Sequence, residues 1–179
     1  MKIQVSKVIN FIGTFDKRHI TLSFADYMQV HGKVLVISNN PLYQFLNEDN
    51  DTSFEVNGIK VIYTVTHQED VSGNYDIIIH DYFKKVVPAD LVVVIETDYD
   101  NDMNSLDTIK NVKSDFLKIL YKGNKEKGLF IQREGDDIST YMGTHKTVEW
   151  IKLVAAINSK LYGTDLKKTF AAIQREVSE

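Results

Sequence analysis

The sequence predicts an α/β fold in which a mainly parallel central sheet is flanked by helices on both faces. Three features lead to this prediction: short unbroken apolar runs, amphipathic segments between them, and polar or glycine-containing turns where the two patterns meet. Unbroken apolar runs are typical of parallel strands covered on both faces, because neither side is suited to water. With 179 residues, 43% of them hydrophobic, the chain is long enough for one full core, so we expect a single domain over residues 1–179.

The first part of the chain, residues 3–40, has the pattern of a βαβ unit. An apolar strand over residues 5–12 is followed by a polar turn, an amphipathic helix over residues 20–31 and a second buried strand over residues 33–38. Asp16 precedes the helix and is a suitable N-terminal cap. A loop of this kind presents backbone N–H groups and the positive end of a helix to an anion, so it is the candidate binding loop of the chain.

Later segments complete the predicted sheet. The dipeptide Asn57-Gly58 between two short apolar runs predicts a tight hairpin at one edge, because both residues tolerate positive φ. An amphipathic helix is expected over residues 106–116, and a further apolar run follows at residues 129–132. The remaining strands are expected at residues 75–80, 89–95 and 117–121.

Four segments resemble one protein family. They are IGTFDKRHITLS at residues 12–23, HGKVLVIS at 31–38, YDIIIHD at 75–81 and ADLVVVI at 89–95. They are similar to the corresponding segments of the ParA/MinD family of deviant-Walker P-loop ATPases, and the similarity covers roughly the first two-thirds of the chain. The resemblance implies a P-loop NTPase-like fold, truncated because family members are longer. It also implies a dimeric positioning factor for partition, pilus, secretion or conjugation-type machinery, with ATP and Mg²⁺ as cofactors of the intact site.

The loop departs from the family pattern at the positions that bind the nucleotide. Of the pattern G-x-x-x-x-G-K-[ST], Gly13 keeps the first glycine. Arg18, His19 and Ile20 stand at the second glycine, the phosphate lysine and the Mg²⁺-binding hydroxyl. Side chains therefore stand where the backbone must approach phosphate, and an isoleucine cannot coordinate a hard cation. We therefore expect the loop to be the relic of a phosphate cradle, in a degenerate site that does not hydrolyse ATP.

The residues suited to binding an anion lie in the loop and at a neighbouring strand end. Thr21 and Asp81 keep their places in the family pattern, whereas Ser38 replaces the aspartate that helps to position the attacking water. The candidate nucleotide- or anion-binding residues are therefore Gly13, Lys17, Arg18, His19, Thr21 and Asp81. Because the carboxyl ends of parallel strands share one edge of a sheet, a second set of residues should lie along it: Gly13, Ser38, Asp81 and Glu96.

Two functions agree with these residues. The first is a pseudo-ATPase that keeps the fold as a platform for protein–protein interaction and needs no cofactor. The second is a true nucleotide-binding ATPase or GTPase switch, in which Lys17, Arg18 and His19 hold phosphate through their side chains. No catalytic residue is assigned, since the histidines are scattered and no G-x-S-x-G motif occurs. No metal site is assigned either, because the D-x-D-x-D run at residues 98–102 lacks the glycine and the glutamate of a calcium loop.

Two helices are expected at the end of the chain, at about residues 146–177. The first is amphipathic and wide enough to lie on the sheet. The second carries a narrow apolar stripe, whose spacing suits pairing with one other helix. The stripe packs either on its own domain or on a second chain in a homodimer. The candidate interaction residues are those of the stripe: Leu166, Phe170, Ile173 and Val177.

The composition excludes several classes of protein. The chain has no cysteine, so a disulfide framework or a cysteine zinc site cannot form. Its net charge of −4 lacks the basic excess that is typical of nucleic-acid-binding proteins. No apolar run approaches the roughly 20 residues that cross a bilayer, and no signal peptide precedes the first strand, so we expect a cytoplasmic protein without a transmembrane segment.

Overall fold

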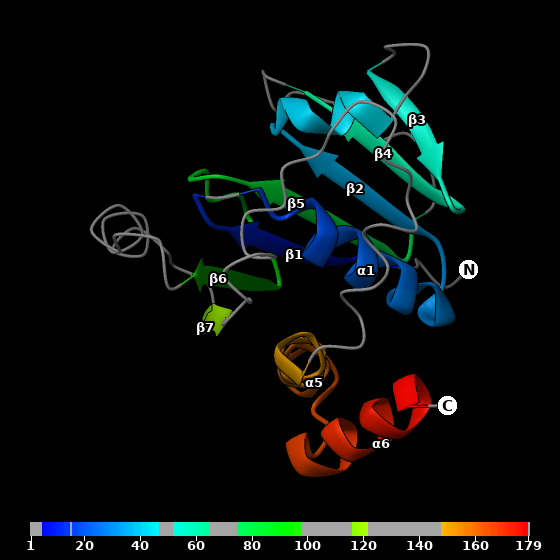
Figure 1. Cartoon of the computed structure of the whole chain (residues 1–179), viewed down its shortest axis with the longest axis vertical. Coiled ribbons are helices and arrows are strands. Elements are labelled where there is room, and N and C mark those ends of the chain that lie inside the picture. The colour runs from blue at the N-terminus through cyan, green and yellow to red at the C-terminus, as the bar shows by residue number, and fades with distance from the viewer. Residues whose placement is uncertain are drawn as a thin grey trace.

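The computed structural model describes residues 5–14, 16–46, 52–64, 75–97, 116–121 and 148–178. These residues form an α/β fold built on a seven-stranded sheet (Figure 1). The strands are β1 (Lys7–Ile12), β2 (Val34–Ser38), β3 (Ser53–Val56), β4 (Ile59–Tyr63), β5 (Ile77–Tyr82), β6 (Leu91–Thr97) and β7 (Phe116–Tyr121). The described helices are α1 (Arg18–Met28), α5 (Val148–Tyr162) and α6 (Leu166–Ser178), with short 3₁₀ segments η1 (Gln29–His31) and η2 (Pro41–Leu46).

The sheet is parallel except at one edge. Its strand order is β3-β4-β2-β5-β1-β6-β7, and every neighbouring pair is parallel apart from β3 and β4. The prediction of a mainly parallel sheet is therefore confirmed. Strand β1 lies between β5 and β6. The connection from β1 leads to β2 on the β5 side of β1, and the connection from β5 leads to β6 on the other side of β1. In α/β sheets, ligands bind at the carboxyl ends of strands around such a point.

The hairpin at the edge of the sheet has the predicted turn. Asn57 has a φ of 50° and Gly58 a φ of 80°, as a two-residue type I′ turn requires. Val56 pairs with Ile59 across the turn, and both side chains are buried. The strand propensity of this segment and its turn residues therefore agree, which explains why the prediction of an edge hairpin is confirmed.

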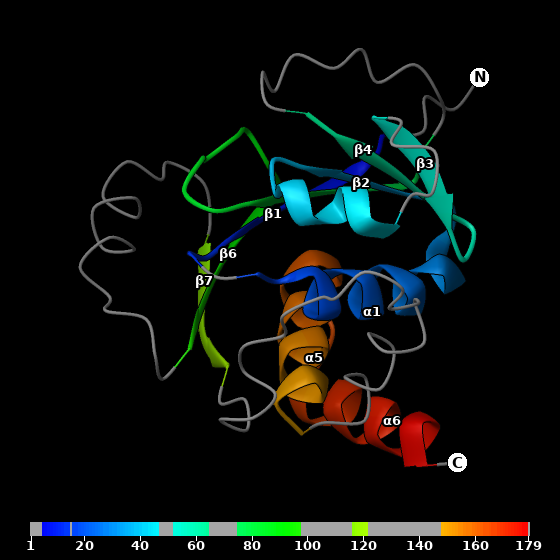
Figure 2. The same ribbon diagram turned by 45° about the horizontal axis from the view of Figure 1, so that its top comes forward.

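The described helices lie on one face of the sheet (Figure 2). The main core cluster joins α1, α5 and Ile173 of α6 to side chains on that face, such as Phe11 and Val93. Side chains on the opposite face, such as Leu35, are buried as well. The sequence predicts helices on both faces, and the described helices cover one. Other predicted segments lie outside the described residues: residues 98–102, 106–115 and 129–132. Phe116, predicted as the last residue of the helix over residues 106–116, is instead the first residue of β7.

The apolar stripe of α6 packs mainly within the chain. Ile173 is 1% exposed and belongs to the main core, and Phe170 and Val177 pack against the same core. Leu166, at the start of the helix, is 50% exposed. Because α6 folds back along α5, Ile173 is part of the protein's own core, and Phe170 and Val177 are partly buried against that core. Leu166 is the exposed residue of the stripe.

Helix α1 begins earlier than the apolar pattern predicts. It starts at Arg18, with Lys17 as the N-cap residue, and both side chains are buried although they are basic. Periodicity of apolar residues cannot detect a first turn whose side chains are charged and buried. Asp16 does not occupy the N-cap position, but its carboxylate accepts a hydrogen bond from the Arg18 backbone N–H at 3.2 Å. Asp16 therefore supports the start of the helix from one residue further away.

Candidate functional site

The candidate site lies at the carboxyl ends of β1, β2 and β5. Strand β5 extends past the predicted end, because Asp81 pairs in the sheet with both Phe11 and Ser38. The Ser38 hydroxyl donates a hydrogen bond to the Asp81 carbonyl oxygen at 2.7 Å. Gly13 follows β1 directly, and the backbone of Glu96 lies at the same end of β6. The residues predicted to share one edge of the sheet therefore do so.

The side chain of Lys17 enters this edge of the sheet. Its Nζ atom lies 3.0 Å from Asp81 Oδ1, and each of the two side chains is 1% exposed. The same ammonium group donates to the carbonyl oxygen of Gly13 at 2.9 Å and to that of Tyr82 at 3.1 Å. Three oxygen acceptors match the three N–H bonds of an ammonium group. Lys17 therefore binds the strand ends and does not project toward solvent.

The Asp81 carboxylate accepts hydrogen bonds from two hydroxyl groups as well. Thr21 of α1 donates to Oδ2 at 3.1 Å, and Tyr43 of η2 donates to the same oxygen at 2.7 Å. Burial, together with the negative charge of Asp81, raises the pKa of Tyr43 well above its ordinary value. Tyr43 is therefore a neutral donor. Loop, helix and 3₁₀ segment thus converge on one buried carboxylate.

A second ion pair, between Arg18 and Asp16, lies at the start of α1 and is hydrogen-bonded to the segment after β2. Arg18 Nε lies 2.9 Å from Asp16 Oδ1, and Nη2 lies 2.7 Å from Oδ2, which is a bidentate contact. The remaining Nη1 of Arg18 donates to the carbonyl oxygen of Leu42 at 2.7 Å. Asn40 Nδ2 donates to Asp16 Oδ1 at 2.8 Å. The guanidinium group is therefore engaged by protein oxygen atoms on two sides.

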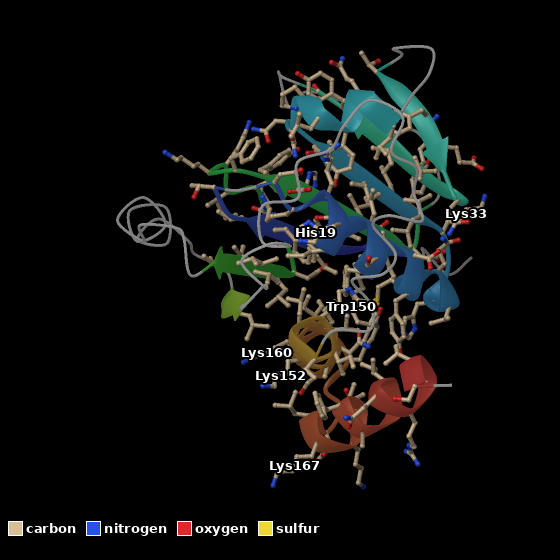
Figure 3. All side chains as sticks on the ribbon, in the orientation of Figure 1. His19, Lys33, Trp150, Lys152, Lys160 and Lys167 are labelled. Atoms are coloured by element: carbon tan, nitrogen blue, oxygen red, sulfur yellow. The ribbon has the colours of Figure 1, made fainter. Side chains whose placement is uncertain are left out.

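His19 follows in the first turn of α1, over the sheet (Figure 3), and its side chain is 4% exposed. Burial lowers the pKa of its imidazole from the ordinary value of 6.5 to about 4. The ring is therefore neutral near pH 7. Because Lys17 and Arg18 are balanced by Asp16 and Asp81, the charged side chains of the cluster sum to zero.

The candidate anion-binding residues predicted from the sequence all lie in this cluster, but their polar groups largely bind one another. Sequence reasoning missed Tyr43 and Asn40, which complete the cluster. No local pattern indicates them, because the fold brings η2 and the turn before it next to the loop. For Asp16 and Arg18, the separation of two residues is a signal in the sequence that is consistent with a local ion pair.

This arrangement is suited to holding the loop in place. Within the described cluster, the hydroxyl groups of Thr21 and Tyr43 donate to the Asp81 carboxylate, and that carboxylate is also paired with the Lys17 ammonium. In the part of the chain that the structure describes, no group of three His, Cys, Asp or Glu side chains is placed to hold a metal ion. Oxygen atoms of Asp81, Gly13 and Tyr82 are hard ligands, and the Lys17 ammonium lies among them.

Comparisons of the sequence with protein-family models and with curated proteins give no match. The resemblance of its motifs to the ParA/MinD ATPases therefore stays a prediction, and the functional argument depends on the fold and on the geometry of the site. Among the described helices, none combines the length and the apolar character needed to cross a membrane.

Proposed function

We propose that this chain is a ParA/MinD-like protein that does not hydrolyse ATP and acts as an interaction or positioning platform. The observation that carries the proposal is the Lys17 ammonium group, whose nitrogen lies within 3.1 Å of three protein oxygen atoms. A phosphate-binding lysine must direct its N–H bonds at the ligand instead. In this protein the fold itself supplies the acceptors.

Binding a nucleotide in the loop requires the internal ion pairs to open first. Leaving one partner of a buried pair without the other costs about 3–5 kcal/mol. Opening Lys17–Asp81, whose side chains are each 1% exposed, therefore costs about 3–5 kcal/mol, and opening Arg18–Asp16, whose carboxylate is 14% exposed, adds a further cost. The first cost alone is a substantial part of the roughly −8 kcal/mol of a micromolar complex. The ion pairs therefore disfavour tight nucleotide binding.

The alternative is an ATPase or GTPase switch in which Lys17, Arg18 and His19 hold phosphate through their side chains. All three side chains are buried, and Lys17 and Arg18 each form an ion pair with a carboxylate. If Lys17 and Arg18 turned toward a phosphate, the carboxylates of Asp16 and Asp81 would lose their partners and would repel the phosphate. The geometry therefore supports the platform better than the switch.

The contacts that fasten Gly13, Asp16, Lys17 and Arg18 to the strand ends and to η2 support the platform function. A rigid surface favours the binding of a protein partner, because little conformational entropy is lost on association. The resembled family suggests partition, pilus, secretion or conjugation-type machinery as the setting, and a homodimer belongs to the same proposal. Leu166 and Tyr162 are large apolar side chains that the structure leaves exposed for such contacts.

Calorimetric titration with ATP, ADP and GTP, each with Mg²⁺, tests the proposal. We expect no affinity tighter than about 1 mM, which corresponds to about −4 kcal/mol. Lys17→Gln and the exposed-site control Lys152→Gln separate binding at the loop from general attraction of phosphate to lysine. A micromolar affinity that Lys17→Gln abolishes and Lys152→Gln preserves would overturn the proposal and favour the nucleotide switch.

Sedimentation velocity tests whether self-association of the chain depends on nucleotide. Dimerisation in the resembled ATPases depends on nucleotide bound at the crevice, whereas a platform without nucleotide must associate by other contacts. We therefore expect the same sedimentation coefficient with and without ATP and Mg²⁺ at tens of micromolar protein. A dimer that forms only when nucleotide is added contradicts the proposal.

A further inference from the structure

The Lys17 ammonium occupies a position that has the ligands of a cation site. Its Nζ atom lies 3.0 Å from Asp81 Oδ1, 2.9 Å from the Gly13 carbonyl oxygen and 3.1 Å from that of Tyr82. A carboxylate and backbone carbonyl oxygens are typical ligands of hard cations in proteins. The oxygens come from the end of β1 and from β5, which neighbour each other in the sheet. The fold therefore builds this set of oxygens.

Contacts that do not involve the lysine hold these oxygens in place. The Gly13 N–H donates to the Phe83 carbonyl oxygen at 3.2 Å, which fixes the turn after β1. The second oxygen of Asp81 is held by the hydroxyl groups of Thr21 and Tyr43. The ring centroid of Phe83 lies 5.1 Å from the ammonium nitrogen and presents a further group that attracts cations. Removing the ammonium should therefore leave a preformed site.

We propose that Asp81 and the carbonyl oxygens of Gly13 and Tyr82 form a site for a primary ammonium ion, and that Lys17 fills it permanently as a built-in counter-ion. The inference deepens the proposed function and rests on it for the native chain, because a protein that carries its own cation needs no Mg²⁺ at this position. A single carboxylate matches the single charge of an ammonium ion. The ligand class of the site is a monovalent cation with N–H donors.

Chemical rescue of Lys17→Ala tests this site directly. Alanine keeps Cβ, and the missing Cγ, Cδ, Cε and Nζ correspond atom for atom to n-propylammonium. We expect the thermal midpoint of Lys17→Ala to be about 3–5 °C higher in n-propylammonium chloride than in tetramethylammonium chloride of equal ionic strength, at ten times the Kd. Tetramethylammonium carries the same charge but has no N–H donor. The native chain has no vacant site and should show no such difference.

Two further variants make the rescue specific. Lys152→Ala removes an exposed lysine on the outer side of α5 (Figure 3), so its midpoint should be the same in both salts. Lys17→Ala/Asp81→Asn lacks the carboxylate and should lose the difference between the salts. The proposal is wrong if folded Lys17→Ala melts at the same temperature in both salts. It is also wrong if the double variant Lys17→Ala/Asp81→Asn still melts at a higher temperature in n-propylammonium chloride than in tetramethylammonium chloride.

A measurement on the native chain decides the matter if Lys17→Ala does not fold. An ammonium group that is 1% exposed and bonded to three acceptors should exchange its protons slowly. We expect a protected ¹⁵N–¹H ammonium signal at pH 7 that Lys17→Met removes and Lys152→Met leaves. Absence of that signal from the native spectrum overturns the proposal. If the native chain binds nucleotide and n-propylammonium still stabilises Lys17→Ala, only the proposed function is overturned. If the chain binds no nucleotide and n-propylammonium does not stabilise Lys17→Ala, only this inference is overturned.

Discussion

Lys17 and Asp81 form a buried ion pair that joins the loop after β1 to the end of β5, with Nζ 3.0 Å from Oδ1. Each side chain is 1% exposed, so water cannot replace either partner. The pair stabilises the site while both partners are present, and it penalises the fold when one is removed. The free energy of unfolding of the domain should therefore change when a residue of this ion pair is replaced.

Asp81→Asn keeps the shape of the side chain but leaves the Lys17 ammonium buried without a counter-ion. We expect the free energy of unfolding, measured with urea, to fall by about 3–5 kcal/mol. The double variant Lys17→Met/Asp81→Asn should lose less than Asp81→Asn alone, because it buries no charge at this position. Glu55→Gln, on the exposed face of β3, should change the free energy by less than about 0.5 kcal/mol. A double variant as unstable as the sum of its single variants would show that the pair is not coupled.

His19 should make the domain less stable in mild acid. Its pKa is about 4 in the folded protein and 6.5 in an exposed chain, so the unfolded state takes up a proton first as the pH falls. The contribution of neutral His19 to the free energy of unfolding is complete above about pH 7.5, declines below pH 6.5 and levels off near pH 4. The total loss of unfolding free energy over this range is about 3 kcal/mol. Urea unfolding at pH 5 and pH 7.5 measures this contribution.

Two histidine variants give the control for this pH dependence. His19→Gln should reduce the difference in unfolding free energy between pH 7.5 and pH 5, because glutamine takes up no proton in this range. His31→Gln replaces an exposed histidine that stacks on Tyr162, and it should leave the difference nearly unchanged. An unchanged pH dependence in His19→Gln would contradict the assignment.

Ile173→Ala should destabilise the isolated chain, because Ile173 lies in the main core at 1% exposure. The expected loss is about 2–5 kcal/mol in urea unfolding, from lost apolar burial and the cavity left behind. Leu166→Ala, at the exposed end of the same stripe, should cost less than about 0.5 kcal/mol. If Ile173→Ala instead left stability unchanged and altered the sedimentation coefficient, this residue would serve a partner rather than the core.

Gly32→Ala and Gly163→Ala should differ sharply in their effects. At Gly32, with φ at 135°, an added Cβ would overlap the Asp76 carboxylate, whose Oδ2 accepts the Lys33 N–H at 2.7 Å. At Gly163, with φ at 65°, nothing lies within 4 Å of an added Cβ. We expect losses of more than about 3 kcal/mol and about 1 kcal/mol respectively in the free energy of unfolding. Equal losses would show that the turn before β2 adapts freely.

The sequence predicts many of the residues that form the site, but not how their side chains bind one another. Gly13, Ser38 and Asp81 could be placed together because the carboxyl ends of parallel strands meet at one edge. The engagement of Lys17 could not be predicted, since a lysine in a loop is equally suited to bind a phosphate or a carboxylate. Tyr43 could not be predicted either, because its hydroxyl meets Asp81 only after η2 has packed on the sheet.

The sequence by itself determined the local elements of this protein. The parallel strands, the Asn57-Gly58 turn and the two C-terminal helices follow from apolar periodicity and backbone preference, which depend on near neighbours in the chain. The tertiary structure alone decided that Lys17 neutralises Asp81 and that Ile173 belongs to the core. The physical reason is that ion pairing and burial depend on which distant segments meet, and the same lysine or apolar stripe suits more than one partner until the fold brings one of them into contact.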